Sequence, residues 1–201
     1  MIKTVLFDLG NVILPFDVTR LAASLTAYCR LSTEEIVEKL WSDKIANEFE
    51  TGLMGAEAYF AHVSEMCGFV GLSYEKFVPI FNEIFIEDEG VNTLIRGLKK
   101  SYRLGLISNT NPIHVPYVMK KYKTLSEFER HWWSNEEGVR KPDPKIYHRA
   151  LDHFEVEPRE AVFIDDLPTN IQSACNIGIN GLLYQGVEPL KKELSKLGVT
   201  Y

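Results

Sequence analysis

The chain has 201 residues, of which 45% are apolar and 25% are charged, and both values are average for a soluble globular protein. This length suffices for one ordinary domain with an insertion, or for two small domains. The net charge of −6 and the lack of a basic run argue against a nucleic-acid-binding surface, although local charge at a site can still favour a phosphorylated substrate.

The sequence shows no pattern that is typical of membrane insertion or export. No stretch approaches the roughly 18 apolar residues of a membrane span, and Asp8 interrupts the first apolar run where a signal peptide would continue it. The three cysteines are widely spaced and form no Cys-x-x-Cys pair, which is typical of free thiols in a reducing compartment. We therefore expect a cytoplasmic protein with no membrane contact. The oligomeric state cannot be predicted from these features.

The first predicted element is a buried strand over residues 4–7. These residues are apolar or strand-forming, and Asp8, Gly10 and Asn11 follow them as a turn. In an open parallel sheet, ligands bind just beyond the carboxyl ends of the strands. Asp8 would stand at such an end, where a carboxylate binds a cation or acts in catalysis. The alternative is a turn aspartate that caps the next segment.

The segment after this strand carries helical signals as far as residue 85. Ser32 opens a capping box with Glu35, and apolar residues at helical spacing follow as far as Trp41. Further helices are predicted over 43–51, 56–66 and 73–85, the last with a kink at Pro79. These helices predict an inserted, bundle-like unit.

The remaining chain alternates between short apolar strands and amphipathic helices. The predicted strands cover 103–107, 131–133, 161–164 and 181–184. The predicted helices cover 91–100, 113–121, 144–154 and 169–177. Such alternation indicates βαβ units, so we predict an α/β fold with a mostly parallel sheet and flanking helices.

Three of the predicted strands end in polar residues of complementary kinds. The first ends at Asp8. The second ends at Ser108 and Asn109, which we expect at a helix N-terminus, where backbone amides favour an anion. The last ends at Asp165 and Asp166, which repel each other unless a hard cation or a lysine lies nearby.

A proline-stiffened loop over residues 140–144 is expected to present Lys141 to the same edge of the sheet. An oxygen-rich site with one lysine and anion-binding groups suits Mg²⁺-assisted phosphoryl transfer. Each residue also has a simpler interpretation: Ser108 and Asn109 as a helix cap, Lys141 as a solvated lysine, the two aspartates as turn residues. The joint site is favoured because all of these groups follow strands of one parallel sheet.

Four segments together resemble the ordered motifs of the haloacid dehalogenase superfamily. They cover 7–12, 107–110, 140–142 and 163–170. The helical insert resembles the small cap of that superfamily, and Glu50-Thr51-Gly52 resembles the Glu-x-Gly turn of such caps. The Asp-Leu-Gly-Asn-Val segment is similar to the branch of bacterial sugar-phosphate phosphatases typified by α-D-glucose-1-phosphate phosphatase. The resemblance implies a Rossmann-like core domain of residues 1–16 and 86–201 and a helical cap domain of residues 17–85.

The resemblance also implies an activity and a set of roles. The protein would be a Mg²⁺-dependent phosphatase that hydrolyses a small phosphorylated metabolite, in particular a sugar phosphate, through an aspartyl-phosphate on Asp8. The implied magnesium ligands come from Asp8, Gly10, Asp166 and Asp165, the last through water or else as a partner of Lys141. The implied substrate-binding residues are Ser108, Asn109, Lys141, Gly10 and Asn11. Lys141 would act beside Asp8 in catalysis, and Asn170 would support the metal site.

Gly10 departs from the pattern of these phosphatases, which carry a second aspartate at this position as general acid and base. Such help is worth about 10²–10⁴-fold in rate. We therefore expect modest rates that rise steeply as the leaving group becomes more acidic, unless another residue supplies the proton. We also expect that Gly10 is needed for a positive φ.

Two other functions remain as alternatives. Haloacid dehalogenases also lack this aspartate, but their first motif has an aromatic residue and a Gly-Thr that Gly10-Asn11-Val12 does not match. A non-catalytic phosphate-binding regulatory protein is the second alternative. The presence of Asp8, Lys141 and Asp166 together argues against it, because each is needed for chemistry and none for folding.

Overall fold

The computed structural model describes residues 1–201, except that the side chain of Asp43 is left out. A five-stranded sheet with the strand order β3-β2-β1-β4-β5 forms its centre. All four neighbouring pairs are parallel. The strands are β1 (Thr4–Phe7), β2 (Arg103–Ser108), β3 (Arg130–Trp133), β4 (Ala161–Asp165) and β5 (Asn180–Leu183). The predicted Rossmann-like α/β fold is confirmed.

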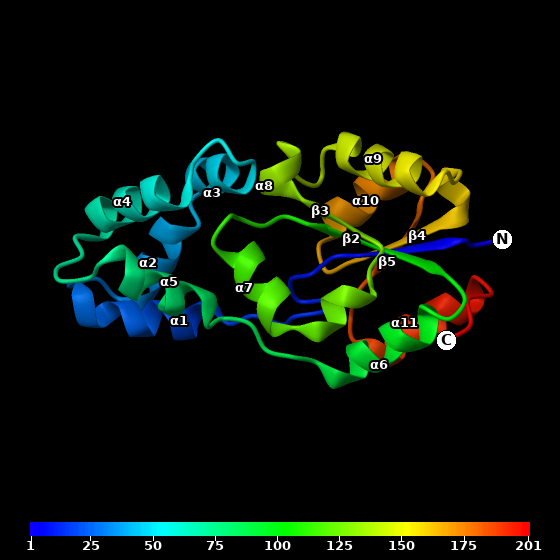
Figure 1. Ribbon diagram of the computed structural model, residues 1–201, viewed down its shortest axis with the longest axis horizontal. Coiled ribbons are helices and arrows are strands. Elements are labelled where there is room, and N and C mark those ends of the chain that lie inside the picture. The colour runs from blue at the N-terminus through cyan, green and yellow to red at the C-terminus, as the bar shows by residue number, and fades with distance from the viewer.

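Helices cover both faces of this sheet (Figure 1). One apolar cluster joins the sheet to three helices, which are α6 (Glu89–Leu98), α7 (His114–Lys121) and α11 (Val187–Lys196). A second cluster joins the opposite face to two helices, which are α9 (Pro144–Phe154) and α10 (Pro168–Asn176). Val5 and Phe7 belong to the first cluster and Leu6 to the second, as the two-residue period of a strand requires. Because both faces are buried, the strands appear in the sequence as continuous apolar runs.

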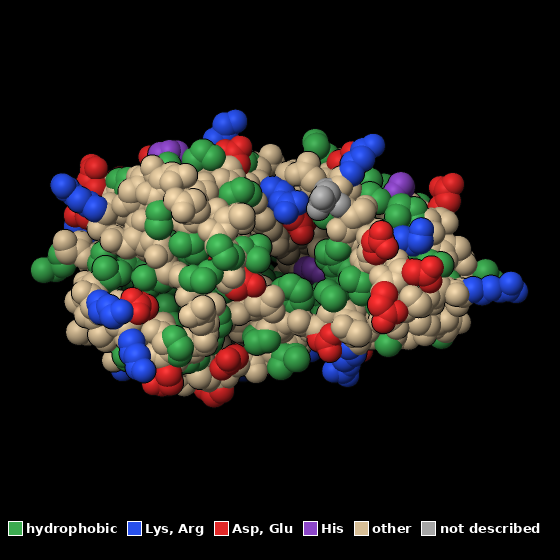
Figure 2. Space-filling view, turned by 180° about the vertical axis from the view of Figure 1, so that it is seen from behind, with side chains coloured by type: hydrophobic (Ala, Val, Ile, Leu, Met, Phe, Trp, Pro, Cys, Tyr) green, Lys and Arg blue, Asp and Glu red, His purple; other side chains and the backbone are tan. Residues whose placement is uncertain are grey.

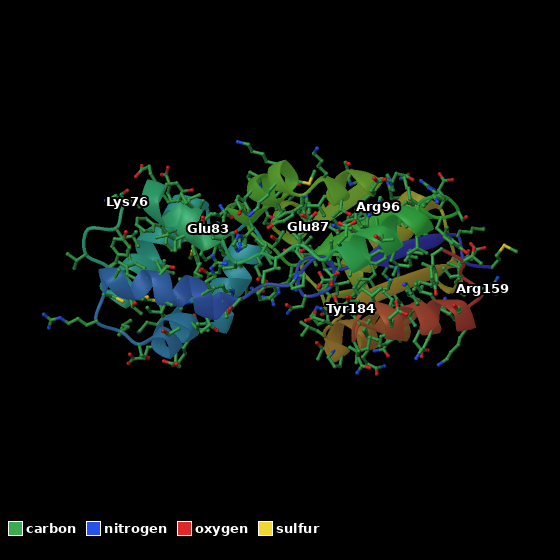
Figure 3. The ribbon with its side chains drawn as sticks, turned by 90° about the horizontal axis from the view of Figure 1, so that it is seen from below. Lys76, Glu83, Glu87, Arg96, Arg159 and Tyr184 are labelled. Carbon is green, nitrogen blue, oxygen red and sulfur yellow. The ribbon has the colours of Figure 1, made fainter. Side chains whose placement is uncertain are left out.

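A second lobe of helices lies beyond one end of the sheet (Figures 1 and 3). Figure 3 shows Lys76 and Glu83 on this lobe, and Arg96 and Tyr184 on the other. The lobe contains α1 (Val18–Leu25), α2 (Thr33–Leu40), α3 (Asp43–Glu50), α4 (Ala56–Cys67) and α5 (Tyr74–Asn82). It has an apolar core of its own, in which the rings of Phe49 and Tyr59 stack 3.9 Å apart. We call this lobe the cap. Its predicted limits at residues 17 and 85 stay a prediction, since Phe85 packs against both lobes.

The capping box at Ser32 is confirmed, because Ser32 and Glu35 each accept a hydrogen bond from the backbone amide of the other.

The predicted end of the fourth cap helix at residue 85 is wrong, since α5 ends at Asn82. The chain leaves the helix there because the two connections between the lobes pair with each other. The amide of Asp17 donates to Ile84 O at 3.0 Å, and the amide of Ile86 donates to Pro15 O at 2.8 Å.

Two α-helices of the core lobe were not predicted. One is α11, although Val187, Leu190 and Leu194 stand at helical spacing. The other is the single turn α8 (Ser134–Glu137), which is too short to show a periodic pattern.

Cys29, Cys67 and Cys175 are free thiols. Among the described residues, none of the helices has the length and apolar character that crossing a bilayer requires.

Candidate functional site

The pairing of β1 with β4 brings three aspartates to one edge of the sheet. Phe7 lies opposite Ile164, and the amide of Asp8 donates to Ile164 O at 2.8 Å. Asp8 and Asp165 therefore follow neighbouring positions on adjacent strands. Asp8, Asp165 and Asp166 each offer a carboxylate oxygen, and these oxygens lie within 4.8 Å of one another. This arrangement is dense in negative charge and suits a hard cation.

Lys141 is the positive charge inside this group. Its side chain is 1% exposed, and Nζ lies 2.6 Å from Asp8 Oδ1 and 2.7 Å from Asp165 Oδ2. Asn109 fixes the loop that carries this lysine, because its side chain accepts from the Lys141 amide at 2.8 Å and donates to Lys141 O at 2.9 Å. Asn109 thus positions Lys141 through its backbone.

Asp165 has its carboxylate oxygens engaged by the protein. Oδ1 accepts from the amide of Leu167 at 2.8 Å, and both oxygens lie 3.0 Å from Nδ2 of Asn170. Oδ2 also accepts from Lys141. Asp165 is fully buried. Of the two roles that the sequence left open for Asp165, this geometry matches the partner of Lys141.

Asp166 accepts its hydrogen bond from a different residue. Its Oδ2 accepts a hydrogen bond from Nδ2 of Asn11 at 3.1 Å. Asn11 has φ of 54°, in the left-handed region that asparagine tolerates, and its side-chain amide reaches the end of β4 from the turn after β1. Together with Asp8, Asp166 lines an open cavity. Asp8 and Asp166 are therefore the carboxylates best placed to bind a metal ion.

The electrostatics of the group also fit a cation. Burial raises the pKa of the Asp8 carboxyl to about 7, against the opposing charge of Lys141. Burial also raises the pKa of Asp166, against the hydrogen bond from Asn11. The pKa of Lys141 is raised, because Asp8 and Asp165 outweigh the effect of burial on its ammonium group. The single lysine does not balance three carboxylates, and a bound divalent cation would lower the cost of ionising them.

Gly10 does not have a positive φ, so that expectation is wrong. Asn11 takes the left-handed conformation in its place. Glycine is favoured at position 10 because a side chain would not fit there: a Cβ atom would lie 2.9 Å from Cε1 of Phe16. The ring of Phe16 therefore occupies the region into which a side chain at position 10 would project.

We expect Gly10→Ala to lower the free energy of unfolding by about 1 kcal/mol, at the lower end of overpacking costs, because Phe16 is 38% exposed and its ring can turn aside. The same substitution in a Phe16→Ala background should cost less, since the clash is gone. Urea unfolding of the four proteins of this double-mutant cycle measures the coupling. An equal cost in both backgrounds would show that Phe16 is not the reason for glycine.

The predicted helix N-terminus at Ser108 and Asn109 is also wrong. The helix α7 begins at His114, and its first amides are bound by Asn111, whose Oδ1 accepts from Ile113 at 3.1 Å and from His114 at 3.0 Å. A turn therefore separates the strand end from the helix. Ser108 still lies at the carboxyl end of β2 and is 1% exposed, beside the cavity floor.

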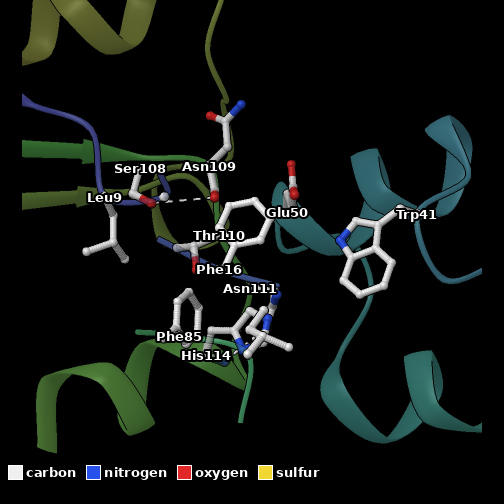
Figure 4. A pocket seen from close by; sticks show the side chains of 12 residues that line it. Leu9, Phe16, Trp41, Glu50, Phe85, Ser108, Asn109, Thr110, Asn111 and His114 are labelled. Atoms are coloured by element: carbon white, nitrogen blue, oxygen red, sulfur yellow. Dashed lines mark hydrogen bonds between the residues drawn. The ribbon is translucent and has the colours of Figure 1, made fainter. Parts of the chain in front are cut away.

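The cap closes this edge of the sheet from the other side. A cavity of about 410 Å³ has the residues Asp8, Asn109, Lys141 and Asp166 on the core side and Val18, Val37, Trp41 and Glu50 on the cap side. A smaller cavity of about 80 Å³ adjoins it at Phe16 and extends to His114 (Figure 4). The hollow between the lobes is visible in Figure 2, with a histidine side chain inside it.

The sequence did not predict which residues of the cap face the cavity. Val37 and Trp41 follow the helical spacing of an ordinary apolar face, so nothing distinguished them from core residues. Glu50 was noted only as part of the turn that resembles those of family caps. Glu50 is the last residue of α3, and this end of the helix faces the core lobe. Oε2 of Glu50 lies 3.2 Å from Nη1 of Arg140.

The chain is similar in sequence and in fold to several known proteins. The family model described as haloacid dehalogenase-like hydrolase matches residues 2–178. D-ribitol-5-phosphate phosphatase of Bacteroides thetaiotaomicron is 26% identical over 204 residues, which cover 97% of this chain and 98% of that protein. A haloacid dehalogenase family enzyme of the same organism, in complex with magnesium and inorganic phosphate, is 28% identical with a TM-score of 0.80 and covers 92% of this chain and 95% of its own. L-2-haloacid dehalogenase of Xanthobacter autotrophicus shares the fold, with 17% identity, a TM-score of 0.68, and coverage of 100% of this chain and 85% of its own.

Proposed function

The chain belongs to the haloacid dehalogenase-like hydrolase family, and on that premise we propose that it is a Mg²⁺-dependent phosphatase of small sugar phosphates that works through an aspartyl-phosphate. One observation carries this proposal. Asp8 stands between a buried lysine at 2.6 Å and the accessible carboxylate of Asp166, at the floor of a cavity that the cap covers. This is the arrangement that a carboxylate nucleophile for phosphoryl transfer requires.

Asp8 is the nucleophile in this proposal. One of its oxygens attacks phosphorus, and the alcohol departs with the bridging oxygen. Water then attacks phosphorus, and the carboxylate of Asp8 is restored as inorganic phosphate leaves. Lys141 contributes positive charge beside Asp8 and is itself held in place by Asp165 and by the backbone contacts to Asn109. Ser108 and Asn109 lie at the same strand end and are proposed to bind phosphoryl oxygens.

Magnesium is the proposed cofactor. Asp8, Asp166 and the backbone carbonyl of Gly10 would hold it, with Asp165 supporting the site through Lys141. When bound, the ion would neutralise charge between Asp8 and an incoming phosphate dianion. The oxygen donors of the three aspartates fit a hard cation, and a similar enzyme has been crystallised with magnesium and phosphate.

The proposed substrate is a small sugar phosphate or polyol phosphate. The cavity of about 410 Å³ lies in the size range of small-molecule sites. Its floor is polar, while Phe16, Val37 and Trp41 give it apolar walls that can pack against the carbon chain of a sugar. The similarity to a ribitol-phosphate phosphatase over nearly the whole chain supports this class.

A screen of phosphorylated metabolites with Mg²⁺ tests the proposal. We expect phosphate release from small sugar and polyol phosphates, such as ribitol 5-phosphate and glucose 1-phosphate, and less from phosphoproteins, because the cap limits the size of the substrate. Release of halide from 2-haloacids without metal, with no phosphate release from any ester, would support the dehalogenase alternative. Binding of phosphate without turnover would support the regulatory one.

A further inference from the structure

The proposed reaction lacks a group that handles the proton of the leaving alcohol. Gly10 carries no side chain, and the ring of Phe16 fills the space beside it. A sugar alkoxide is a poor leaving group, and protonation of its oxygen is worth about 10²–10⁴-fold in rate. A proton donor at another position in the cavity would restore this contribution.

Few ionisable side chains of the described residues line the two cavities, and most are committed elsewhere. They are Asp8, Glu50, His114, Arg140, Lys141 and Asp166. Asp8 is the proposed nucleophile, Asp166 the proposed metal ligand, and Lys141 is held in two ion pairs. Arg140 cannot release a proton near neutral pH, because a guanidinium group is always charged in proteins.

His114 is not suited to donate a proton either. Its ring is buried, stacks on Phe81 at 4.5 Å, and its Nδ1 lies 3.0 Å from Oδ1 of Asn82. Burial lowers the pKa of His114 to about 3, so the imidazole is neutral at physiological pH. This contact joins α7 to the end of α5 and serves the junction of the two lobes.

Glu50 is the remaining candidate. It borders both cavities, and Figure 4 shows it among the side chains that line the smaller one. Its Oε2 is buried and accepts no hydrogen bond from the described residues, although it forms an ion pair with Nη1 of Arg140 at 3.2 Å. Burial raises the pKa of Glu50, against the opposing charges of Arg140 and Lys141. A carboxyl group in such surroundings can carry a proton closer to neutral pH than an exposed one.

The turn after Glu50 is held closely against the core. Gly52 has φ of +73°, and a Cβ atom on it would lie 2.2 Å from the backbone oxygen of Asn135 in α8. Any side chain at this position would push the turn away from the core. Glu50 is therefore followed directly by a turn that packs tightly against the core lobe.

We propose that Glu50, supplied by the cap, is the general acid and base that replaces the side chain missing at Gly10. The inference rests on the proposed phosphatase function. Protonated Glu50 gives its proton to the bridging oxygen as the phosphorus–oxygen bond breaks and the bond from Asp8 to phosphorus forms, so that a neutral alcohol leaves. The Glu50 carboxylate then takes a proton from water as the water oxygen attacks phosphorus. The bond from Asp8 to phosphorus breaks in this step, and its electrons restore the Asp8 carboxylate as inorganic phosphate leaves.

Glu50→Gln tests this role with aryl phosphates that carry no hydroxyl groups. Phenyl phosphate and p-nitrophenyl phosphate differ mainly in the acidity of the leaving phenol. We expect kcat/KM of the variant to fall by about 10²-fold for phenyl phosphate and by only a few-fold for p-nitrophenyl phosphate. The wild-type enzyme should show a shallow dependence on the acidity of the leaving group, and the variant a steep one.

Two control variants separate this role from a structural one. Glu48 lies on the same helix and borders neither cavity. Glu48→Gln should therefore keep the wild-type kcat/KM for both substrates. Arg140→Gln removes the ion pair but keeps the carboxyl group, so any loss should be equal for both substrates. An equal loss for both substrates in Glu50→Gln would overturn the proposal. A wild-type enzyme that hydrolyses neither these esters nor any phosphorylated metabolite would refute the phosphatase function itself.

Discussion

Asp8→Asn is expected to lower phosphate release by roughly 10³-fold or more while the fold stays intact. An amide cannot attack phosphorus, so the covalent step is lost. The structure should tolerate the change, because the amide oxygen can still accept from Lys141 and the buried site loses one of its negative charges. Phosphate release with the preferred ester, at equal protein concentration, measures the effect.

The control for this variant is Asp152→Asn, an exposed aspartate on α9 far from the cavity. It makes the same chemical change and should keep the wild-type rate. Circular dichroism and thermal unfolding should show that Asp8→Asn is folded and at least as stable as the wild type. Turnover by folded Asp8→Asn above a few per cent of the wild-type rate would rule out the covalent role of Asp8.

Removal of the metal is expected to lower phosphate release about as much as Asp8→Asn does. Activity should vanish with a chelator and return with added Mg²⁺, because three carboxylates and a phosphate dianion cannot share this edge of the sheet with Lys141 alone. Asp166→Ala should behave like the chelated enzyme at ordinary Mg²⁺ concentrations. Steady-state phosphate release against Mg²⁺ concentration gives both results.

A measurement without turnover provides an independent check. Mg²⁺ at about 100 times its dissociation constant should stabilise the wild-type fold by about 2.7 kcal/mol, since it binds only the folded state. Asp166→Ala should show much less stabilisation, and Glu48→Gln should show the full effect. Phosphatase activity that persists in excess chelator would contradict the role of the metal.

The sequence predicted which strand ends meet at the candidate site better than it predicted the contacts between their side chains. Parallel strands that are buried on both faces appear as apolar runs, and their carboxyl ends must meet at one edge of the sheet. Asp8, Ser108 and Asp165 could therefore be placed together from the sequence pattern alone. The distances from Lys141 to two carboxylates could not be predicted, because they depend on how a loop folds over the edge.

Contacts outside the regular elements could not be predicted for a similar reason. The helical spacing of Val37 and Trp41 identifies an apolar face but not the cavity that part of this face borders. Phe16 contacts Gly10 across a turn, and no local sequence pattern indicates this contact. The end of α5 at Asn82 depends on pairing between two connections about seventy residues apart in the chain. In each case the deciding interaction is long-range.

The proposed function depends on the transfer of phosphate through a covalent bond to Asp8. The most direct measurement is to quench the enzyme with acid during turnover of a ³²P-labelled sugar phosphate and to map the labelled peptide by mass spectrometry. We expect the label on the peptide that contains Asp8, at no more than one phosphoryl group per chain. It should be lost at alkaline pH, as an acyl phosphate is, and absent from Asp8→Asn. A turning-over enzyme with no label at Asp8, or with label on another residue, would contradict the proposal.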